Sequence, residues 1–186
     1  MQKNQVLVRK INHLTDARYF AAMGVEWMSI GLSPDPASFA FWHAIRDWVE
    51  GVKLVAEPDM RNEDVVARTI IDAKPDGIVK SGGSLVEMIP THIPVFYRIS
   101  PDEESDPPET GYLILPYEPS GFWEDIAMVT DPERIFLEAE WTVEWIEAVL
   151  AGGYTGGFCF RGGEEEQRGV RDYEKMDVML GMLERI

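Results

Sequence analysis

The sequence predicts a parallel α/β protein with a single domain covering residues 1–186. Short apolar segments recur at regular intervals along the chain, and segments with helical periodicity lie between them. This alternation is typical of a parallel sheet in which a helix follows each strand. A chain of 186 residues suits one hydrophobic core, and no linker or low-complexity segment divides it.

The boundaries of the elements follow from apolar runs, turn residues and capping signals. The predicted strands are Val6–Ile11, Trp27–Leu32, Val52–Glu57, Gly77–Lys80, Pro94–Ile99, Tyr112–Leu115, Arg134–Ala139 and Gly157–Arg161. The predicted helices are Leu14–Met23, Phe39–Glu50, Asn62–Ala73, Ser84–Ile89, Gly121–Val129, Thr142–Leu150 and Tyr173–Ile186. Asn62 and Thr142 are expected to cap helix N-termini, and Gly24 and Gly51 are expected to end helices.

One helix is missing from the pattern. Residues 101–110, between the fifth and sixth predicted strands, contain the adjacent prolines Pro107 and Pro108 and a high density of acidic residues. Proline removes a backbone donor and clashes with the preceding turn, and dense like charge opposes compaction. We therefore expect an exposed acidic loop here in place of a helix.

Composition excludes several classes of function. The net charge of −16 argues against nucleic acid or an anionic membrane as a partner, because both are bound through basic patches. The single Cys159 allows no internal disulfide, and the three histidines lie in separate elements, so neither a metal nor a cofactor is expected. No apolar run reaches the length of a membrane span and no signal-peptide core is present. We expect a cytoplasmic protein, monomeric or homodimeric.

The last predicted strand and the residues after it carry the most specific pattern. Gly157–Arg161 is followed by Gly162 and Gly163, then by a charged loop and an amphipathic segment. This block resembles the last strand, glycine turn and loop of phosphoribosylanthranilate isomerases. The residues that match the family without a gap are Gly157, Gly163, Glu165, Gly169, Val170, Asp172, Glu174 and Lys175.

A second block near the N-terminus agrees with the first. It runs from Ile11 to Gly24 and resembles the first helix of the same family and the turn that leads into its second strand. The matching residues are Leu14, Asp16, Ala17, Ala21 and Gly24. The resemblance implies a (β/α)8 TIM barrel. Since such barrels typically need about 250 residues, we expect a trimmed barrel in which the acidic loop replaces helix five.

The resemblance implies a cysteine base at the end of strand one and an aspartate acid at the end of strand six, which together catalyse an Amadori rearrangement in tryptophan biosynthesis. In this chain the base position holds Arg9, or Asn12 in another register. The acid position holds Leu115, or Pro116 after a slip of one residue. Arginine stays protonated, an amide does not titrate, and leucine and proline carry no acid. No residue is therefore assigned a catalytic role.

Charged residues at predicted strand ends nevertheless suggest a ligand site at the C-terminal barrel face. The candidates are Arg9, Lys80, Arg98, Glu138, Glu140, Arg161, Gly162 and Gly163. The resemblance implies a phosphate cradle at the ends of strands seven and eight, so Arg161 is a candidate for binding an anion. Alternatively, Arg161 pairs internally with Glu138 or Glu140, and the charges neutralise one another as a lattice inside the barrel.

Three functions are consistent with these observations. The first is a divergent paralogue without the isomerase activity, which binds or acts on another small molecule, with phosphate compounds among the candidates. The second is an active isomerase with substituted catalytic groups. The third is a non-catalytic interaction protein that uses its acidic loop and its aromatic helices.

Overall fold

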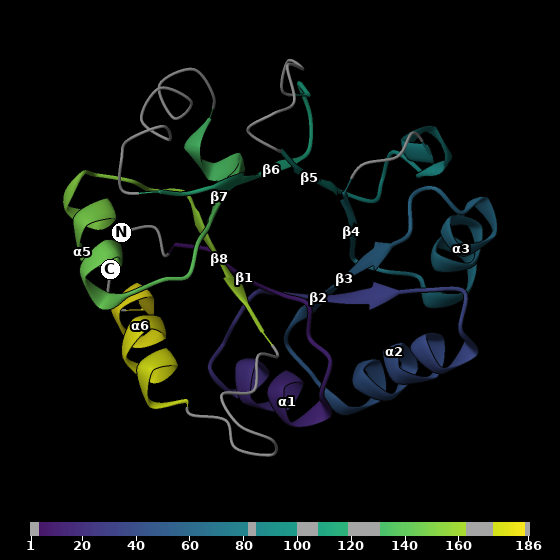
Figure 1. The fold of residues 1–186 in the computed structure, drawn as a ribbon, viewed down its shortest axis with the longest axis horizontal. Helices are drawn as coiled ribbons and strands as arrows, with labels where there is room; N and C mark the ends of the chain where they lie inside the picture. Colours follow the sequence, from purple (N-terminus) through teal and green to yellow (C-terminus); the bar gives the residue numbers. More distant parts are fainter. Residues whose placement is uncertain (1–3, 82–84, 100–107, 119–130, 163–172, 185–186) are drawn as a thin grey trace.

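The computed structural model describes residues 4–81, 85–99, 108–118, 131–162 and 173–184. Within them, eight parallel strands close into a barrel, and each strand pairs with its neighbours in the sequence. Figure 1 shows the strands as a ring with the labelled helices outside it. The predicted TIM barrel is therefore confirmed.

The elements lie close to their predicted positions. The strands are β1 (Val6–Arg9), β2 (Trp27–Leu32), β3 (Lys53–Pro58), β4 (Gly77–Lys80), β5 (Val95–Arg98), β6 (Tyr112–Pro116), β7 (Ile135–Glu138) and β8 (Gly157–Arg161). The α-helices are α1 (Leu14–Ala22), α2 (Pro36–Trp48), α3 (Glu63–Arg68), α5 (Val143–Ala151) and α6 (Glu174–Glu184). Short turns of other helix types cover Thr69–Ala73, Leu85–Met88 and Pro132–Arg134.

The start of α2 was predicted too late, since the helix begins three residues before the predicted Phe39. Asp35 accepts a hydrogen bond from the amide of Ala37 and caps the helix, and Pro36 occupies its first turn. An Asp-Pro pair is a recognised start signal for a helix. The sequence therefore contained the correct boundary.

The predicted N-capping residues act as expected. Asn62 accepts from the amide of Val65, and Thr142 accepts from the amide of Trp145. Gly24, with a φ of +70°, directly follows the C-cap of α1 in the left-handed region in which glycine commonly ends a helix. The expectation for Gly51 was wrong, because α2 ends at Trp48 and the extended residue Val49 is its C-cap.

The trimmed side of the barrel lies between β4 and β6. The predicted helix Ser84–Ile89 is only the short 3-10 turn Leu85–Met88. Between β5 and β6, the described residues contain no helix, and Pro108 to Gly111 form bends and irregular backbone. Most of the predicted acidic loop and the predicted helix Gly121–Val129 lie outside the described residues.

The core has two concentric parts. One cluster, which we call the outer cluster, packs between the outer faces of the strands and the helices. The other, which we call the inner cluster, fills the barrel itself and comprises Leu7, Trp27, Val55, Val79, Phe96, Ile114, Phe136 and Cys159. The barrel is thus a packed core rather than a pore, as is usual for this fold.

Candidate functional site

A layer of charged side chains lies directly above the inner cluster, at the C-terminal ends of the strands. Strands β1, β3, β5 and β7 each contribute one side chain to the inner cluster: Leu7, Val55, Phe96 and Phe136. Side chains two residues further along a strand point the same way. The next inward residues on these strands, which we call the charged layer, are Arg9, Glu57, Arg98 and Glu138. Their charges alternate around the barrel.

Arg9 is the centre of the charged layer and is only 2% exposed. Its Nε and Nη2 donate to the two oxygens of Glu57 at 2.9 and 2.7 Å, and its Nη1 donates to Glu138 at 2.6 Å. Burial alone would lower the pKa of Arg9. The hydrogen bond to Glu57 and the charges of Glu57 and Glu138 outweigh that effect and hold the pKa above its ordinary value. Arg9 is therefore a permanent cation.

Glu138 joins three arginines. Besides Arg9, it accepts a hydrogen bond from Nε of Arg98 at 2.9 Å, and Nε of Arg161 lies 3.7 Å from its Oε1. Burial by itself would raise the pKa of Glu138, but the charge of Arg9 and the hydrogen bond from Arg98 bring it below the ordinary value. Glu138 is therefore ionised at neutral pH.

Ser29 supports the layer from β2, which the sequence analysis missed. Its hydroxyl donates to Oε1 of Glu57 and accepts from the amide of Lys10 at 3.2 Å. Lys10 has a φ of 59°, so the chain turns sharply just after Arg9. The available signal was a lone polar residue at an inward position of an otherwise apolar strand.

Of the other predicted ligand-binding residues, Arg161 and Glu140 lie beside the charged layer, whereas Lys80 does not belong to it. Arg161 lies 3.7 Å from Glu140, so the expected internal pairing occurs with both Glu138 and Glu140. Lys80 is not in the layer: its neighbour Val79 points inward, and the Lys80 ammonium lies 5.9 Å from the ring centre of Tyr97.

The glycine turn after β8 is not open to an anion at Gly162. Its amide donates to the carbonyl of Arg9 at 2.7 Å, and a Cβ there would lie 2.8 Å from Ile11. Gly162 therefore packs β8 against β1. Gly163 lies outside the described residues.

The positions that the resemblance assigned to catalysis hold no acid or base. Asn12, the alternative to Arg9, is exposed just before α1. Leu115 packs into the outer cluster, away from the barrel interior, and Pro116 ends β6. Cys159 is fully buried in the inner cluster, and its burial and the charge of Glu138 raise the pKa of its thiol well above the ordinary value.

The solved structures that match this chain agree with the TIM-barrel fold described above. No family model and no curated protein matches the chain. The phosphoribosylanthranilate isomerase from Thermus thermophilus is 21% identical over 96% of this chain and 98% of its own, with a TM-score of 0.72. The enzyme from Pyrococcus furiosus is 10% identical over 98% and 100%, with a TM-score of 0.74.

The chain has the fold of the phosphoribosylanthranilate isomerases. The structural likeness confirms the resemblance at the level of fold. It extends to other enzymes, since a truncated 3-deoxy-D-arabino-heptulosonate 7-phosphate synthase from Thermotoga maritima matches over 98% of this chain and 86% of its own at 10% identity, with a TM-score of 0.63. One fold carries different reactions, so the function has to be argued from the site.

A cavity of about 540 Å³ opens beside the charged layer, at the ends of β2, β3 and β4. This cavity, which we call the mouth cavity, has the volume of a small-molecule site. Its lining residues are Gly31, Leu32, Ser33, Glu57, Pro58, Asp59, Arg61, Val79 and Ser81. Within the described residues, no cluster of three His, Cys, Asp or Glu side chains could hold a metal ion, and no helix is long and apolar enough to cross a membrane.

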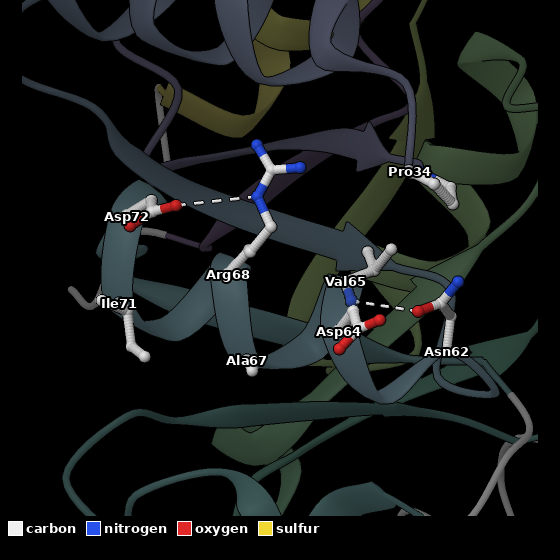
Figure 2. Close-up of a pocket in the computed structure, with 8 residues that line it drawn as sticks. All are labelled: Pro34, Asn62, Asp64, Val65, Ala67, Arg68, Ile71 and Asp72. Carbon is white, nitrogen blue, oxygen red and sulfur yellow. Dashed lines mark hydrogen bonds and ion pairs between the residues drawn. The ribbon is translucent and has the colours of Figure 1, made fainter.

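A second cavity lies on the outer surface, along α3 and next to Pro34 (Figure 2). Its polar groups serve the helix itself. Asn62 caps α3, and Arg68 pairs with Asp72 one turn later at 3.6 Å. The guanidinium of Arg68 also lies 4.1 Å from the ring centre of Phe39. These contacts explain the residues there without a ligand, so the mouth cavity is the better candidate of these two.

Proposed function

We propose that this chain is a phosphoribosylanthranilate isomerase-like barrel that does not catalyse that isomerisation. Instead, it binds or acts on another small molecule at its C-terminal face. The observation that carries the proposal is the environment of Arg9. It stands at one of the two positions, Arg9 and Asn12, where the resemblance puts the general base, and it is buried between Glu57 and Glu138.

A base at this position would have to accept a proton from the substrate. Arg9 cannot accept one, because it stays protonated and its two carboxylate partners favour the cation. Neither carboxylate is an obvious replacement: each is hydrogen-bonded to Arg9, and Glu138 is only 6% exposed. Loss of one acid or base typically costs about 10²–10⁴ in rate, and here both of the implied groups are replaced.

The proposal that a small molecule binds at the C-terminal face is supported by the charged side chains at that end of the barrel. Arg98 and Arg161 are 41% and 37% exposed, so both cations are accessible to a bound molecule. An anionic group on a ligand would find two guanidinium groups there. Such groups bind carboxylates and phosphates in a planar, two-point geometry.

The test is an assay of the purified protein with phosphoribosylanthranilate, together with complementation of a tryptophan auxotroph that lacks the isomerase. We expect no growth and no turnover, while the Thermus thermophilus enzyme on the same plasmid restores growth. Robust growth that Arg9→Met or Glu138→Gln abolishes, in protein that remains folded, would establish the alternative function of an active isomerase with substituted groups.

A further inference from the structure

A third cavity, of about 730 Å³, lies on the outer wall of the barrel near the N-terminal ends of β5, β6 and β7. We call it the wall groove. It is lined by residues of the segment 86–94, of β5 and of the segment 109–112, and by Arg134. The charged layer stands at the opposite, C-terminal ends of the strands, so the wall groove is a separate place on the molecule.

The wall groove lies where a complete barrel has a helix. In a (β/α)8 barrel, a helix follows each strand and packs on the outside of the sheet. Between β5 and β6 the described residues contain no helix, and Phe96 of β5 points into the inner cluster. Its neighbours Val95 and Tyr97 therefore point outward, and both are only half-buried in the wall groove, beside Ile89 and Ile93. An apolar surface that a helix usually covers is thus partly accessible.

Close packing fixes the floor of the wall groove. Gly111 has a φ of +88°, and a Cβ there would lie 2.5 Å from the carbonyl oxygen of Val95 and 2.9 Å from the ring of Tyr97. Arg134 holds the same segment, because its Nε donates to the carbonyl of Gly111 at 2.7 Å and its Nη2 donates to that of Pro108 at 2.9 Å. The groove is therefore preformed, as small-molecule sites usually are.

The charged side chains of the wall groove favour a cation. Glu87 and Glu109 line it from the two segments that border it, and both are exposed. Neither forms a hydrogen bond or an ion pair with any residue that the structure describes. Among the described lining residues, Arg134 is the one basic side chain, and two of its nitrogens are bonded to backbone carbonyls. The lining is thus net negative, and the overall charge of −16 also attracts cations.

We propose that the wall groove binds a small amphipathic cation, a primary amine with an apolar body. The body packs on Val95, Tyr97 and Ile93, and the ammonium group faces the carboxylates of Glu87 and Glu109. The cavity has the volume of a small-molecule site, and its mainly apolar lining with a few polar groups is typical of such sites. An apolar anion of the same size would meet two like charges.

The experiment is calorimetry of the intact protein with methylamine, butylamine, hexylamine, 1-hexanol and hexanoate. We expect affinity to rise along the amine series by about fourfold for each methylene group that becomes buried. Hexylamine should bind at least about twofold more tightly than hexanol, and hexanoate should bind most weakly of the three. No binding of hexylamine at millimolar concentration, equal binding of methylamine and hexylamine, or equal binding of hexanol and hexylamine would overturn the proposal.

Variants locate the site. Glu87→Gln and Glu109→Gln should each weaken hexylamine binding by about two- to fivefold, leave hexanol unchanged, and lose their effect at high salt. Glu147→Gln is the matched control, because it removes an exposed carboxylate from α5 that does not line the wall groove. Circular dichroism checks that all three variants are folded. Equal weakening in Glu147→Gln would show that only net charge matters, and would overturn the proposal.

A second copy of the chain is the competing occupant of this apolar surface. Sedimentation of the parent and of Glu87→Lys tests it. A concentration-dependent dimer that Glu87→Lys dissociates and that hexylamine leaves intact would assign the groove to a protein contact instead. The wall groove is separate from the charged layer, so hexylamine binding and its loss in the variants support this inference whether or not the protein turns over phosphoribosylanthranilate.

Discussion

Arg9 at the end of β1 and Glu138 at the end of β7 meet inside the barrel, with 2.6 Å between Nη1 and Oε1. The two residues are separated by 129 positions in the chain. Their contact places a permanent cation at Arg9, one of the two positions, with Asn12, at which the resemblance implies a catalytic base. It also links two of the four strands whose side chains form the charged layer.

Removal of Arg9 should destabilise the protein strongly. Arg9→Met leaves Glu57 and Glu138 buried without their common partner, and breaking a buried ion pair from one side typically costs about 3–5 kcal/mol. Urea unfolding monitored by circular dichroism measures the change. The triple variant Arg9→Met, Glu57→Gln, Glu138→Gln should recover much of the loss, because no unpaired charge is left. A single Arg9→Met variant as stable as the parent would show that the layer contributes nothing to the fold.

Stability should fall in acid in a way that depends on Glu138. The pKa of Glu138 is lower in the folded protein than its ordinary value of 4.5. The resulting stabilisation is fully present above that ordinary value and is lost as the pH falls through the folded pKa. Glu138→Gln should therefore lower stability at pH 7 and flatten the decline between about pH 5 and pH 2. Glu144→Gln, at an exposed helix N-terminus, is the control and should retain most of the decline.

Glu140 should limit the affinity of Arg161 for anions. The two side chains lie 3.7 Å apart, and Glu140 is 74% exposed. Exposed pairs of this kind are worth roughly 0.2–1 kcal/mol. Glu140→Gly should therefore bind phosphate or sulfate about two- to fivefold more tightly than the parent, with the gain reduced at high salt. Calorimetry at two ionic strengths measures both effects. Strong phosphate binding in the parent that Arg161→Ala leaves unchanged would indicate a differently built anion site.

Two glycines on strands should differ in their tolerance of an added methyl group. Gly157 faces Phe136 in the inner cluster, and a Cβ there would lie 2.5 Å from the ring. Gly157→Ala should cost about 1–3 kcal/mol through overpacking. Gly31→Ala meets open space and should change the unfolding free energy by no more than about 0.5 kcal/mol. Thermal unfolding of both variants provides the measurement, and a large loss in Gly31→Ala would contradict the open cavity.

The sequence by itself determined the architecture. Apolar periodicity predicted all eight strands, and capping residues such as Asn62 and Thr142 correctly marked helix starts, because these signals depend on residues only a few positions apart. It also predicted that the positions implied for catalysis lack an acid and a base. That follows from side-chain chemistry alone, whichever register is correct.

Only the tertiary structure decided which charges meet. The sequence left open whether Arg161 pairs with Glu138 or Glu140, and whether Lys80 belongs to the mouth. Strand ends that are far apart in the chain become neighbours only when the barrel closes, and a shift of one residue turns a side chain to the other face. For this reason Arg98 points into the charged layer while Lys80 points out beside Tyr97.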